Sequence, residues 1–323
     1  MLNIETTLKK ILILLTTTLL LAACSSDSDP AVTNDGRRVP LQVTGYIADT
    51  PHGITRAYGT YWEAGDQIGL YAVNSDTTTP IEDGSNVCYS TTSGGNTTGP
   101  TFLLFSTSTP IILPATGNID VYGYYPYSSG ATTPAAVAVN VSKQDPQNAI
   151  DLMTTGKVST STHNGTTPIN STNSKCELLF QHRLTKLVFN LDLTEMGTVG
   201  TTSLTIGSQK TSATYSIYTD VLTCSGDANQ TITAVVGTTT DALHKSYEAI
   251  VLPNDASTNP ALDRTVTIVV DGRSYTFTIA KSGAPSSNKV VTSSFETGRK
   301  YIYNVKVYPF TIEVNTEKYT EQW

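Results

Sequence analysis

Four histidines are the residues of this chain best suited to act as general bases or metal ligands, and they are far apart: His52, His163, His182 and His244. The sequence contains no GxSxG, HExxH, P-loop or GxGxxG segment that would give one of them a catalytic or ligand-binding setting. His182 lies within the apolar run from Phe180 to Leu184, which favours a buried structural histidine. The sequence therefore predicts no enzyme, no catalytic residue and no cofactor. An unrecognised hydrolase is the weakest alternative.

An acidic pair beside a tryptophan is the other candidate for chemistry. Glu63 and Asp66 flank Trp62 and Gly65 and could form a site for a glycan or a carboxylate. The Gly65-Asp66 step is explained more simply as a turn that leads into a strand beginning near Gln67. We therefore expect a turn here, and not a binding site.

The four cysteines are Cys24, Cys88, Cys176 and Cys224. They form neither CxxC nor CxH, so the spacing predicts no zinc site. The position of Cys24 near the N-terminus gives it a separate role, so three cysteines remain, which is an odd number. One disulfide is possible in an oxidising compartment, but the sequence does not identify the pair. The fold must therefore be stabilised mainly by its hydrophobic core.

The N-terminus has the pattern of an export signal. Lys9-Lys10 precede the apolar run 11–21, and Leu21-Ala22-Ala23 lead directly to Cys24. The run is shorter than the roughly 20 apolar residues that a membrane-spanning helix needs. Cysteine after Leu-Ala-Ala resembles a lipobox, which implies cleavage before Cys24 and acylation of its thiol, so that the acyl chains hold the protein at a membrane. The alternative is an ordinary signal peptide with a chance cysteine at the cut.

The composition is typical of an extracellular β protein. The formal net charge is −7 and only 15% of residues are charged, so no basic stripe predicts a nucleic-acid partner. Glycine and tyrosine are frequent, at 23 and 17 residues, and threonine and serine are abundant. Threonine and tyrosine suit pleated, half-exposed surfaces.

Apolar residues alternate along short segments, and no segment keeps a 3.6-residue period. In 39–47, Val39, Leu41, Val43, Gly45 and Ile47 share one face of a predicted half-buried strand. Further strands are predicted at 67–71, 101–105, 119–125, 176–191, 203–206, 213–218, 231–236, 247–252, 265–270, 274–279 and 301–314. Asp271-Gly272 predicts a two-residue hairpin. A short helix is predicted within 142–153, with Asp145 as its cap and Pro146 in its first turn.

Many short strands at regular intervals predict an all-β chain of two tandem β-sandwiches with mostly antiparallel strands. We expect a signal peptide over 1–23, a disordered tether over 24–38, an N-terminal domain over 39–175 and a C-terminal domain over 176–323. At the C-terminal end the apolar phase flips at Pro309, which predicts a bulge or an edge strand there.

Several segments together resemble the fimbrillin family, the subunits of protease-assembled type V pili. They are the lipobox; Thr55-Arg56-Ala57 followed by Trp62-x-x-Gly65-Asp66-x-Ile68-Gly69; Tyr124-Tyr125-Pro126-Tyr127; Asp151-Leu152-Met153; Phe180-x-His182-Arg183-Leu184-x-Lys186-Leu187; and Gly298-Arg299-Lys300-Tyr301-x-Tyr303. The resemblance implies two transthyretin-like domains, export as a lipoprotein and a cut after an arginine by an Arg-specific protease.

The resemblance places that cut after Arg56, before Ala57, in a loop with Pro51 and Gly53 that follows the strand 39–47. A cut at Arg37 or Arg38 would precede the strand and free nothing. We expect cleavage after Arg56 to free a displaced strand carrying Val39, Leu41, Val43 and Ile47. The segment of a neighbouring subunit with matching alternation is its C-terminal one, so the predicted donor-strand residues are Tyr301, Tyr303, Val305, Val307, Phe310, Ile312 and Val314.

These expectations describe an outer-membrane lipoprotein precursor that becomes part of a cell-surface fimbrium and supports adhesion. Its partners would be other pilus subunits, identical or related, the maturation protease and, through the lipid, the outer membrane. A tip or anchor subunit is an alternative within the same class. A monomeric glycan-binding lipoprotein is the alternative from another class, with aromatic stacking on sugars by Tyr122, Tyr124, Tyr125 and Tyr127.

Overall fold

The computed structural model describes residues 38–48, 61–94, 102–239, 241–316 and 321–322. Several residues singled out in the sequence lie outside these ranges: Cys24, Arg37, His52, Arg56, Ala57 and Trp323. The described residues belong to one compact unit.

The prediction of an all-β chain is confirmed, because the period-2 segments form strands that pair mainly antiparallel. In the described ranges the helical segments are two 3-10 turns, η1 (Gln147–Ala149) and η2 (Thr194–Met196). The helix predicted within 142–153 is therefore a single turn. Its N-cap is Pro146, which is extended (φ −82°, ψ 145°) and makes no side-chain cap, so Asp145 does not cap it. The residue before a proline is disfavoured in helical conformation, so Asp145 cannot be part of the turn.

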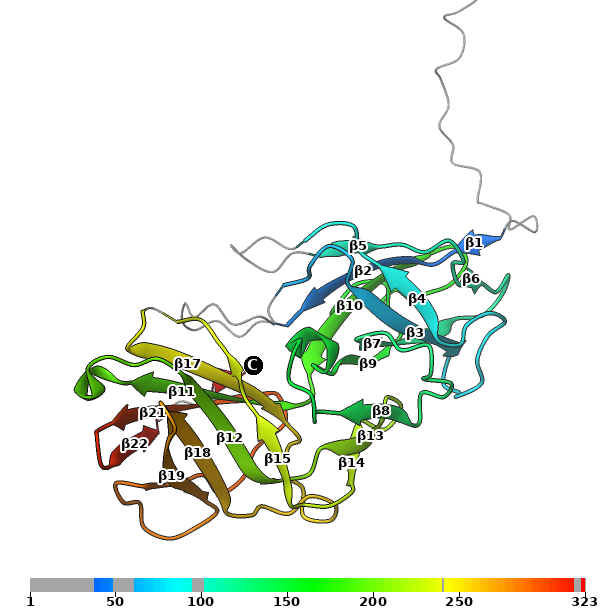
Figure 1. Ribbon diagram of the computed structural model, residues 1–323. Helices are drawn as coiled ribbons and strands as arrows, with labels where there is room; N and C mark the ends of the chain where they lie inside the picture. The colour runs from blue at the N-terminus through cyan, green and yellow to red at the C-terminus, as the bar shows by residue number, and fades with distance from the viewer. Residues whose placement is uncertain (1–37, 49–60, 95–101, 240, 317–320, 323) are drawn as a thin grey trace, which may run out of the picture. The chain divides into compact units, whose positions relative to one another are not determined.

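The first sheet has seven strands in the order β4-β3-β7-β9-β10-β2-β5 (Figure 1). Their bounds are β2 (Gln42–Ile47), β3 (Gln67–Asn74), β4 (Val87–Ser90), β5 (Leu103–Phe105), β7 (Ile119–Tyr125), β9 (Met153–Val158) and β10 (Lys175–His182). All pairs are antiparallel except β2 with β10. The sheet curls toward closure, since Ser90 and Ser106 exchange two backbone hydrogen bonds of 2.9 Å between its end strands.

One hydrophobic core fills the inside of this curled sheet. It contains Val43, Ile68, Leu70, Phe105 and Phe180 among other buried residues. A short sheet of β1 (Val39–Pro40) and β6 (Ile112–Leu113) adjoins it. The predicted strand 39–47 is thus two strands interrupted at Leu41, which is buried in the same core.

Two further sheets share a second core. One has the order β16-β17-β11-β21-β22, with β23 also paired to β21, and the other has the order β15-β12-β18-β19-β20. Their strands are β11 (Thr185–Asp192), β12 (Thr202–Gln209), β15 (Gln230–Thr233), β16 (Val235–Val236), β17 (His244–Val251), β18 (Arg264–Val270), β19 (Arg273–Ala280), β20 (Lys289–Val291), β21 (Arg299–Val307), β22 (Ile312–Thr316) and β23 (Glu321–Gln322). The ring of Phe189 in β11 lies 5.2 Å from that of Tyr303 in the neighbouring strand β21 and, across to the other sheet, 6.2 Å from that of Phe277 in β19, between ring centres. This is the layered arrangement of a β-sandwich.

The predicted hairpin at Asp271-Gly272 is confirmed. Val270 pairs with Arg273, and Asp271 and Gly272 both have positive φ, 46° and 82°. That conformation belongs to the two-residue turn whose twist matches its flanking strands.

A three-stranded sheet links segments from the two halves of the sequence. β8 (Val137–Asn140) pairs with β13 (Ser212–Ser216), which pairs with β14 (Val221–Ser225). The predicted domain boundary at 175/176 falls at the start of β10, which pairs with β2 and β9. The change of sheet occurs at Arg183-Leu184 instead, so the predicted strand 176–191 is two strands in different sheets.

Close packing of β3 on β7 makes one glycine critical. Gly69 pairs with Tyr124, and a Cβ on Gly69 would lie 2.0 Å from the Tyr124 ring. We expect Gly69→Ala to lower the free energy of unfolding by about 1–3 kcal/mol, because the ring must leave its packed position. Denaturant unfolding would measure this. Gly130→Ala is the matched control, since its Cβ would meet only Ser128 Oγ at 3.7 Å, and a loss equal to that of Gly69→Ala would contradict the explanation.

A loop in the C-terminal half predicts a pH dependence. Burial raises the pKa of Asp255, but hydrogen bonds donated by Ser257 and Thr258, from both backbone N–H and hydroxyl groups, outweigh it and lower the pKa from 3.8 to about 2. Because the folded pKa is the lower one, the stabilisation is complete above about pH 4 and is lost as the pH falls toward 2.

We therefore expect Asp255→Asn to lower the free energy of unfolding by about 1 kcal/mol at pH 7, a figure reduced for solvent screening. Most of this difference should be lost by pH 2, and it should disappear below pH 2, where Asp255 is protonated in both the folded and the unfolded state. Denaturant unfolding between pH 2 and 7 measures the difference. Glu82→Gln, which removes an exposed carboxylate, controls for the lost charge. A stability difference for Asp255→Asn that stays constant down to pH 2 would be inconsistent with this account.

Candidate functional site

Strand β2 is an interior strand of the seven-stranded sheet, although it lies near the N-terminal end of the described chain. Residues 42–47 pair in parallel with 175–180 of β10, and residues 43–45 pair antiparallel with 103–105 of β5 (Figure 1). The connection is extended at both ends: Leu41 N donates to Ile111 O at 2.9 Å, and Ala48 N donates to Phe180 O at 2.8 Å. Loss of β2 would leave unpaired backbone groups on both β10 and β5.

The side chains of β2 alternate between the core and the outer face. Val43 and Ile47 are buried, as is Leu41, whereas Val39 is half-buried in β1. The predicted displaced-strand residues therefore lie on one paired segment with their apolar side chains packed inward. Their functional role stays a prediction.

An aromatic cluster forms the wall that faces this segment. The indole of Trp62 lies edge-on to the rings of Phe105 and Phe180, each at 5.1 Å between ring centres. The Trp62 indole N–H donates a 3.2 Å hydrogen bond to the carbonyl oxygen of Gly45. All three rings are buried. This slot, defined as the surface of Trp62, Phe105, Phe180 and the edges of β5 and β10 that β2 covers, is our candidate site.

The predicted cleavage position follows β2 in the sequence, within residues 49–60. Arg56 and Ala57 lie between Ala48 and Tyr61, in the part that the structure does not describe. Of the two competing arginines, Arg38 is exposed just before β1, and Arg37 lies outside the described residues. The lipidation residue Cys24 also lies outside them.

The predicted donor residues fall on two antiparallel strands. Tyr308 N donates to Thr311 O at 2.8 Å, so Pro309 lies in the turn between β21 and β22. The phase flips because the chain reverses at Pro309, in a turn and not in a bulge, and the strand that follows, β22, is the edge strand of its sheet in the described part of the chain, as the second alternative predicts. Phe310, in the turn, is 92% exposed.

The two strands differ in how firmly they are held. β21 is paired on both sides, in parallel with β11 and antiparallel with β22, and buries Tyr301, Tyr303, Val305 and Val307. In the described part of the chain β22 pairs as a strand with β21 alone, is held on its other side by a hydrogen bond from Val314 N to Ser287 O at 3.0 Å, and buries Ile312 and Val314. Withdrawing β22 would open one edge, whereas withdrawing β21 would split its sheet.

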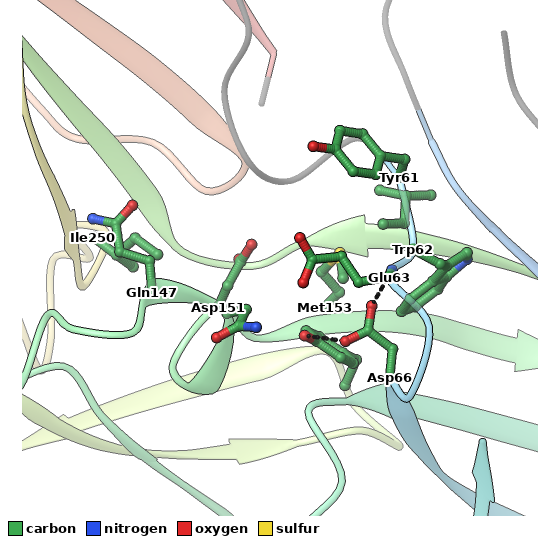
Figure 2. Close-up of a pocket in the computed structure, with 11 residues that line it drawn as sticks. Tyr61, Trp62, Glu63, Asp66, Gln147, Asp151, Met153 and Ile250 are labelled. Atoms are coloured by element: carbon green, nitrogen blue, oxygen red, sulfur yellow. Dashed lines mark hydrogen bonds between the residues drawn. The ribbon is translucent and has the colours of Figure 1, made fainter. Parts of the chain in front are cut away.

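A pocket adjoins the slot, and the acidic residues Glu63 and Asp66 are among those that line it. It has about 470 Å³ of empty space, including the part open to solvent, and is lined by Trp62, Glu63, Asp66, Asp151 and Tyr125 among others (Figure 2). Asp66 accepts hydrogen bonds from Glu63 N at 2.7 Å and from Tyr125 Oη at 3.0 Å. Burial raises the pKa of Asp66, and these hydrogen bonds oppose the shift. Asp66 thus stabilises the predicted turn ahead of β3.

His182 is a buried structural residue, as expected. Its Nδ1 lies 2.9 Å from Asp151 Oδ1, and both side chains are buried. Among the described residues, no group of three or more His, Cys, Asp or Glu side chains could hold a metal ion. Cys88, Cys176 and Cys224 are free thiols, and burial raises the pKa of Cys176 and, to about 11, that of Cys224.

The tyrosines considered as a sugar-stacking surface are packed inside the protein. Tyr122, Tyr124 and Tyr125 are buried, and Tyr127 is half-buried. The Tyr124 hydroxyl donates to Asn86 Oδ1 at 2.7 Å, and the Tyr122 ring packs against Tyr218 at 4.8 Å between centres. Their ring faces are therefore not exposed as a continuous surface on which a sugar could stack.

Comparison with known proteins decides the family. Residues 55–323 match the sequence profile of the family described as "Fimbrillin-like". The chain belongs to the fimbrillin-like family. It is similar to a Bacteroides uniformis protein named "Putative fimbrium subunit Fim1C", with 31% identity over 308 residues that cover 91% of this chain and 90% of that protein. The family is therefore one of fimbrial structural subunits and cell-adhesion proteins.

Solved structures agree with this fimbrillin-like assignment. A crystal structure described as a putative cell adhesion protein from Bacteroides uniformis has 28% identity and a TM-score of 0.64, covering 88% of this chain and 99% of that one. Another, from Bacteroides ovatus, has 20% identity and a TM-score of 0.66, covering 89% and 98%, and supports the fold. No helix in the described part of this fimbrillin-like chain is long and apolar enough to cross a membrane.

Sequence reasoning found the strand of the slot but missed its wall. Phe105 and Phe180 lie in separate predicted strands, and nothing local in the sequence pairs either ring with Trp62. One signal was available. Gly45 occupies an inward position of an otherwise apolar alternation, and glycine inside a strand often marks a close approach of other groups.

Proposed function

We propose that this fimbrillin-like chain is a structural subunit of a cell-surface fimbrium that is assembled by donor-strand exchange and supports adhesion. In this proposal the precursor is exported, acylated at Cys24 and held at the outer membrane. An Arg-specific protease then cuts between Arg56 and Ala57. The observation that carries the proposal is the position of β2, an interior strand of the seven-stranded sheet that precedes Arg56 in the sequence.

Cleavage would change how β2 is held. Before the cut, β2 is covalently continuous with β3, so any local opening is followed by rapid return. After the cut, only the paired backbone and the buried side chains of Leu41, Val43 and Ile47 hold the segment. Burial of each such side chain contributes about 1.5–3 kcal/mol. A competing strand that makes equivalent contacts could therefore replace it.

The vacated slot would be a template for strand addition. Both β10 and β5 would present unpaired N–H and C=O groups, and the aromatic wall would be open to apolar side chains. Repetition of one such head-to-tail contact generates a filament, because the two surfaces involved are different and the contact does not close on itself.

On the donor side, the pairing favours β22 over β21. Phe310, Ile312 and Val314 lie on the turn and on β22, which pairs on one side with β21. We assign the donor role to these three residues. Tyr301, Tyr303, Val305 and Val307 would remain in the β21 strand, where they form part of the second core.

The test is maturation in the native host. We expect fimbriae to contain this chain with Ala57 as its N-terminus by mass spectrometry. Arg56→Ala should leave a lipidated precursor that is absent from fimbriae. Arg38→Ala, which changes an exposed arginine before β1, is the matched control and should assemble normally. Normal incorporation of Arg56→Ala would refute the maturation step. An intact form lipidated at Cys24 as the only form in fimbriae would indicate an anchor subunit.

A further inference from the structure

The slot is too tight for a side chain larger than a methyl group at one of its four inward positions, and even a methyl group would be crowded there. A Cβ placed on Gly45 would lie 3.2 Å from Phe105 Cε2 and 3.3 Å from Phe180 Cε2. Both distances are shorter than ordinary carbon–carbon contacts of 3.5–4.0 Å. A β-branched residue would add two more atoms to the same space. The profile of the slot, read along β2, is therefore a large side chain at Leu41, a medium one at Val43, none at Gly45 and a large one at Ile47.

The two rings that close this position, those of Phe105 and Phe180, are also packed on their other sides. Phe180 is confined from behind as well, because a Cβ on Gly123 of β7 would lie 3.2 Å from Phe180 Cζ. Its ring is therefore held between two glycine backbones, those of β2 and β7. Phe105 is packed against Trp62, and all three rings are buried. Close-packed interiors do not yield to added atoms without a cost in stability.

The C-terminal segment of this chain does not match that profile. After Gly298 the sequence contains no glycine, alanine or serine. If Phe310 takes the Leu41 position, Val314 falls on the Gly45 position. If Ile312 takes the Leu41 position, Thr316 falls on the Gly45 position. The same holds for a donor strand of the opposite direction. If Ile312 takes the Ile47 position, Val314 falls on the Gly45 position, and if Val314 takes the Ile47 position, Thr316 does so. Each of these registers puts a β-branched residue against Phe105 and Phe180.

We propose that the slot selects donor strands that have glycine, or at most alanine, at the Gly45 position, and that this subunit consequently takes its donor from a different subunit and not from a copy of itself. This inference rests on the proposed donor-strand exchange. Phe105 and Phe180 are the residues that set the selectivity, and Trp62 does not discriminate, because it binds a backbone carbonyl that every strand supplies.

Peptide binding to the mature protein tests the proposal. The full chain is cleaved with an Arg-specific protease, the released segment is exchanged out in mild denaturant, and fluorescent peptides are added. The parent peptide has the sequence of residues 39–47. A Gly45→Val peptide should bind at least tenfold more weakly. A Thr44→Val peptide, which places the same residue on the outward face, is the matched control and should bind like the parent.

Two further peptides examine the chain's own C-terminal segment. A peptide of residues 310–318 should bind at least tenfold more weakly than the parent, and its Val314→Gly or Thr316→Gly version should regain tenfold. Cleaved protein alone should form no filaments in electron micrographs.

Equal binding of the parent and Gly45→Val peptides, or filaments from the cleaved protein alone, would overturn the selectivity and leave strand exchange standing. Failure of the parent peptide itself to bind would overturn strand exchange, and the selectivity with it.

Discussion

Replacing Trp62 with alanine is expected to lower the free energy of unfolding by about 3–5 kcal/mol and to loosen the hold on β2. The indole is buried and packs at 5.1–5.3 Å against the rings of Phe105, Tyr125 and Phe180. Truncation leaves a cavity at the centre of the slot and removes the hydrogen bond to Gly45 O. Denaturant unfolding measures the total loss. Amide hydrogen exchange in β2 measures the local one.

A second substitution separates packing from hydrogen bonding at the same position. Trp62→Phe keeps an aromatic ring but loses the indole N–H, so we expect a smaller loss than for alanine, with exchange in β2 still faster than in the parent. If Trp62→Ala cost less than about 1 kcal/mol, or if exchange rose everywhere except in β2, the indole would not be the support of the slot that its contacts indicate.

Local patterns predicted most of the longer strands but missed β4, β8, β9 and β14, and they did not assign the strands to sheets. The Asp271-Gly272 turn and the segment 119–125 each have a local signal and form the predicted element, whereas the alternating segment 39–47 is divided at Leu41. The segments 176–191 and 231–236 are each predicted as one strand, yet each divides between two sheets. A break such as Arg183-Leu184 is set by what packs on either side of it, and period-2 patterning carries no information about that.

The same distinction applies to the slot and to the C-terminal segment. The inward face of Leu41, Val43 and Ile47 was predictable, because it depends on one strand alone. The wall was not, because Phe105 and Phe180 meet Trp62 only through pairing between β5, β2 and β10. The change in phase of the apolar alternation at Pro309 was visible in the sequence, but a turn and a bulge both produce such a change. Only the pairing of β22 back onto β21 decides between them.

A buried ion pair on the face of the β11–β17 sheet that points away from the second core leads to the other large expected effect. Lys186 of β11 and Glu248 of β17 lie on paired strands with Nζ 2.7 Å from Oε2, and both residues are buried. We expect Glu248→Leu to lower the free energy of unfolding by about 3–5 kcal/mol, because it removes this carboxylate and leaves the ammonium of Lys186 buried. Lys186→Met should have a loss of similar size, since it leaves the carboxylate there.

The double variant decides whether the loss comes from the charges or from the shape of the site. Replacement of a whole buried ion pair by apolar residues of similar size is often neutral or stabilising, because the cost of removing both charges from water disappears. Lys186→Met combined with Glu248→Leu should therefore recover most of the stability lost by either change alone, which denaturant unfolding of all four proteins as a double-mutant cycle measures. Additive losses would mean that the side chains act through packing. The ion pair joins β11 and β17, whose sheet does not contain β2, so a loss confined to that sheet should leave amide exchange in β2 unchanged.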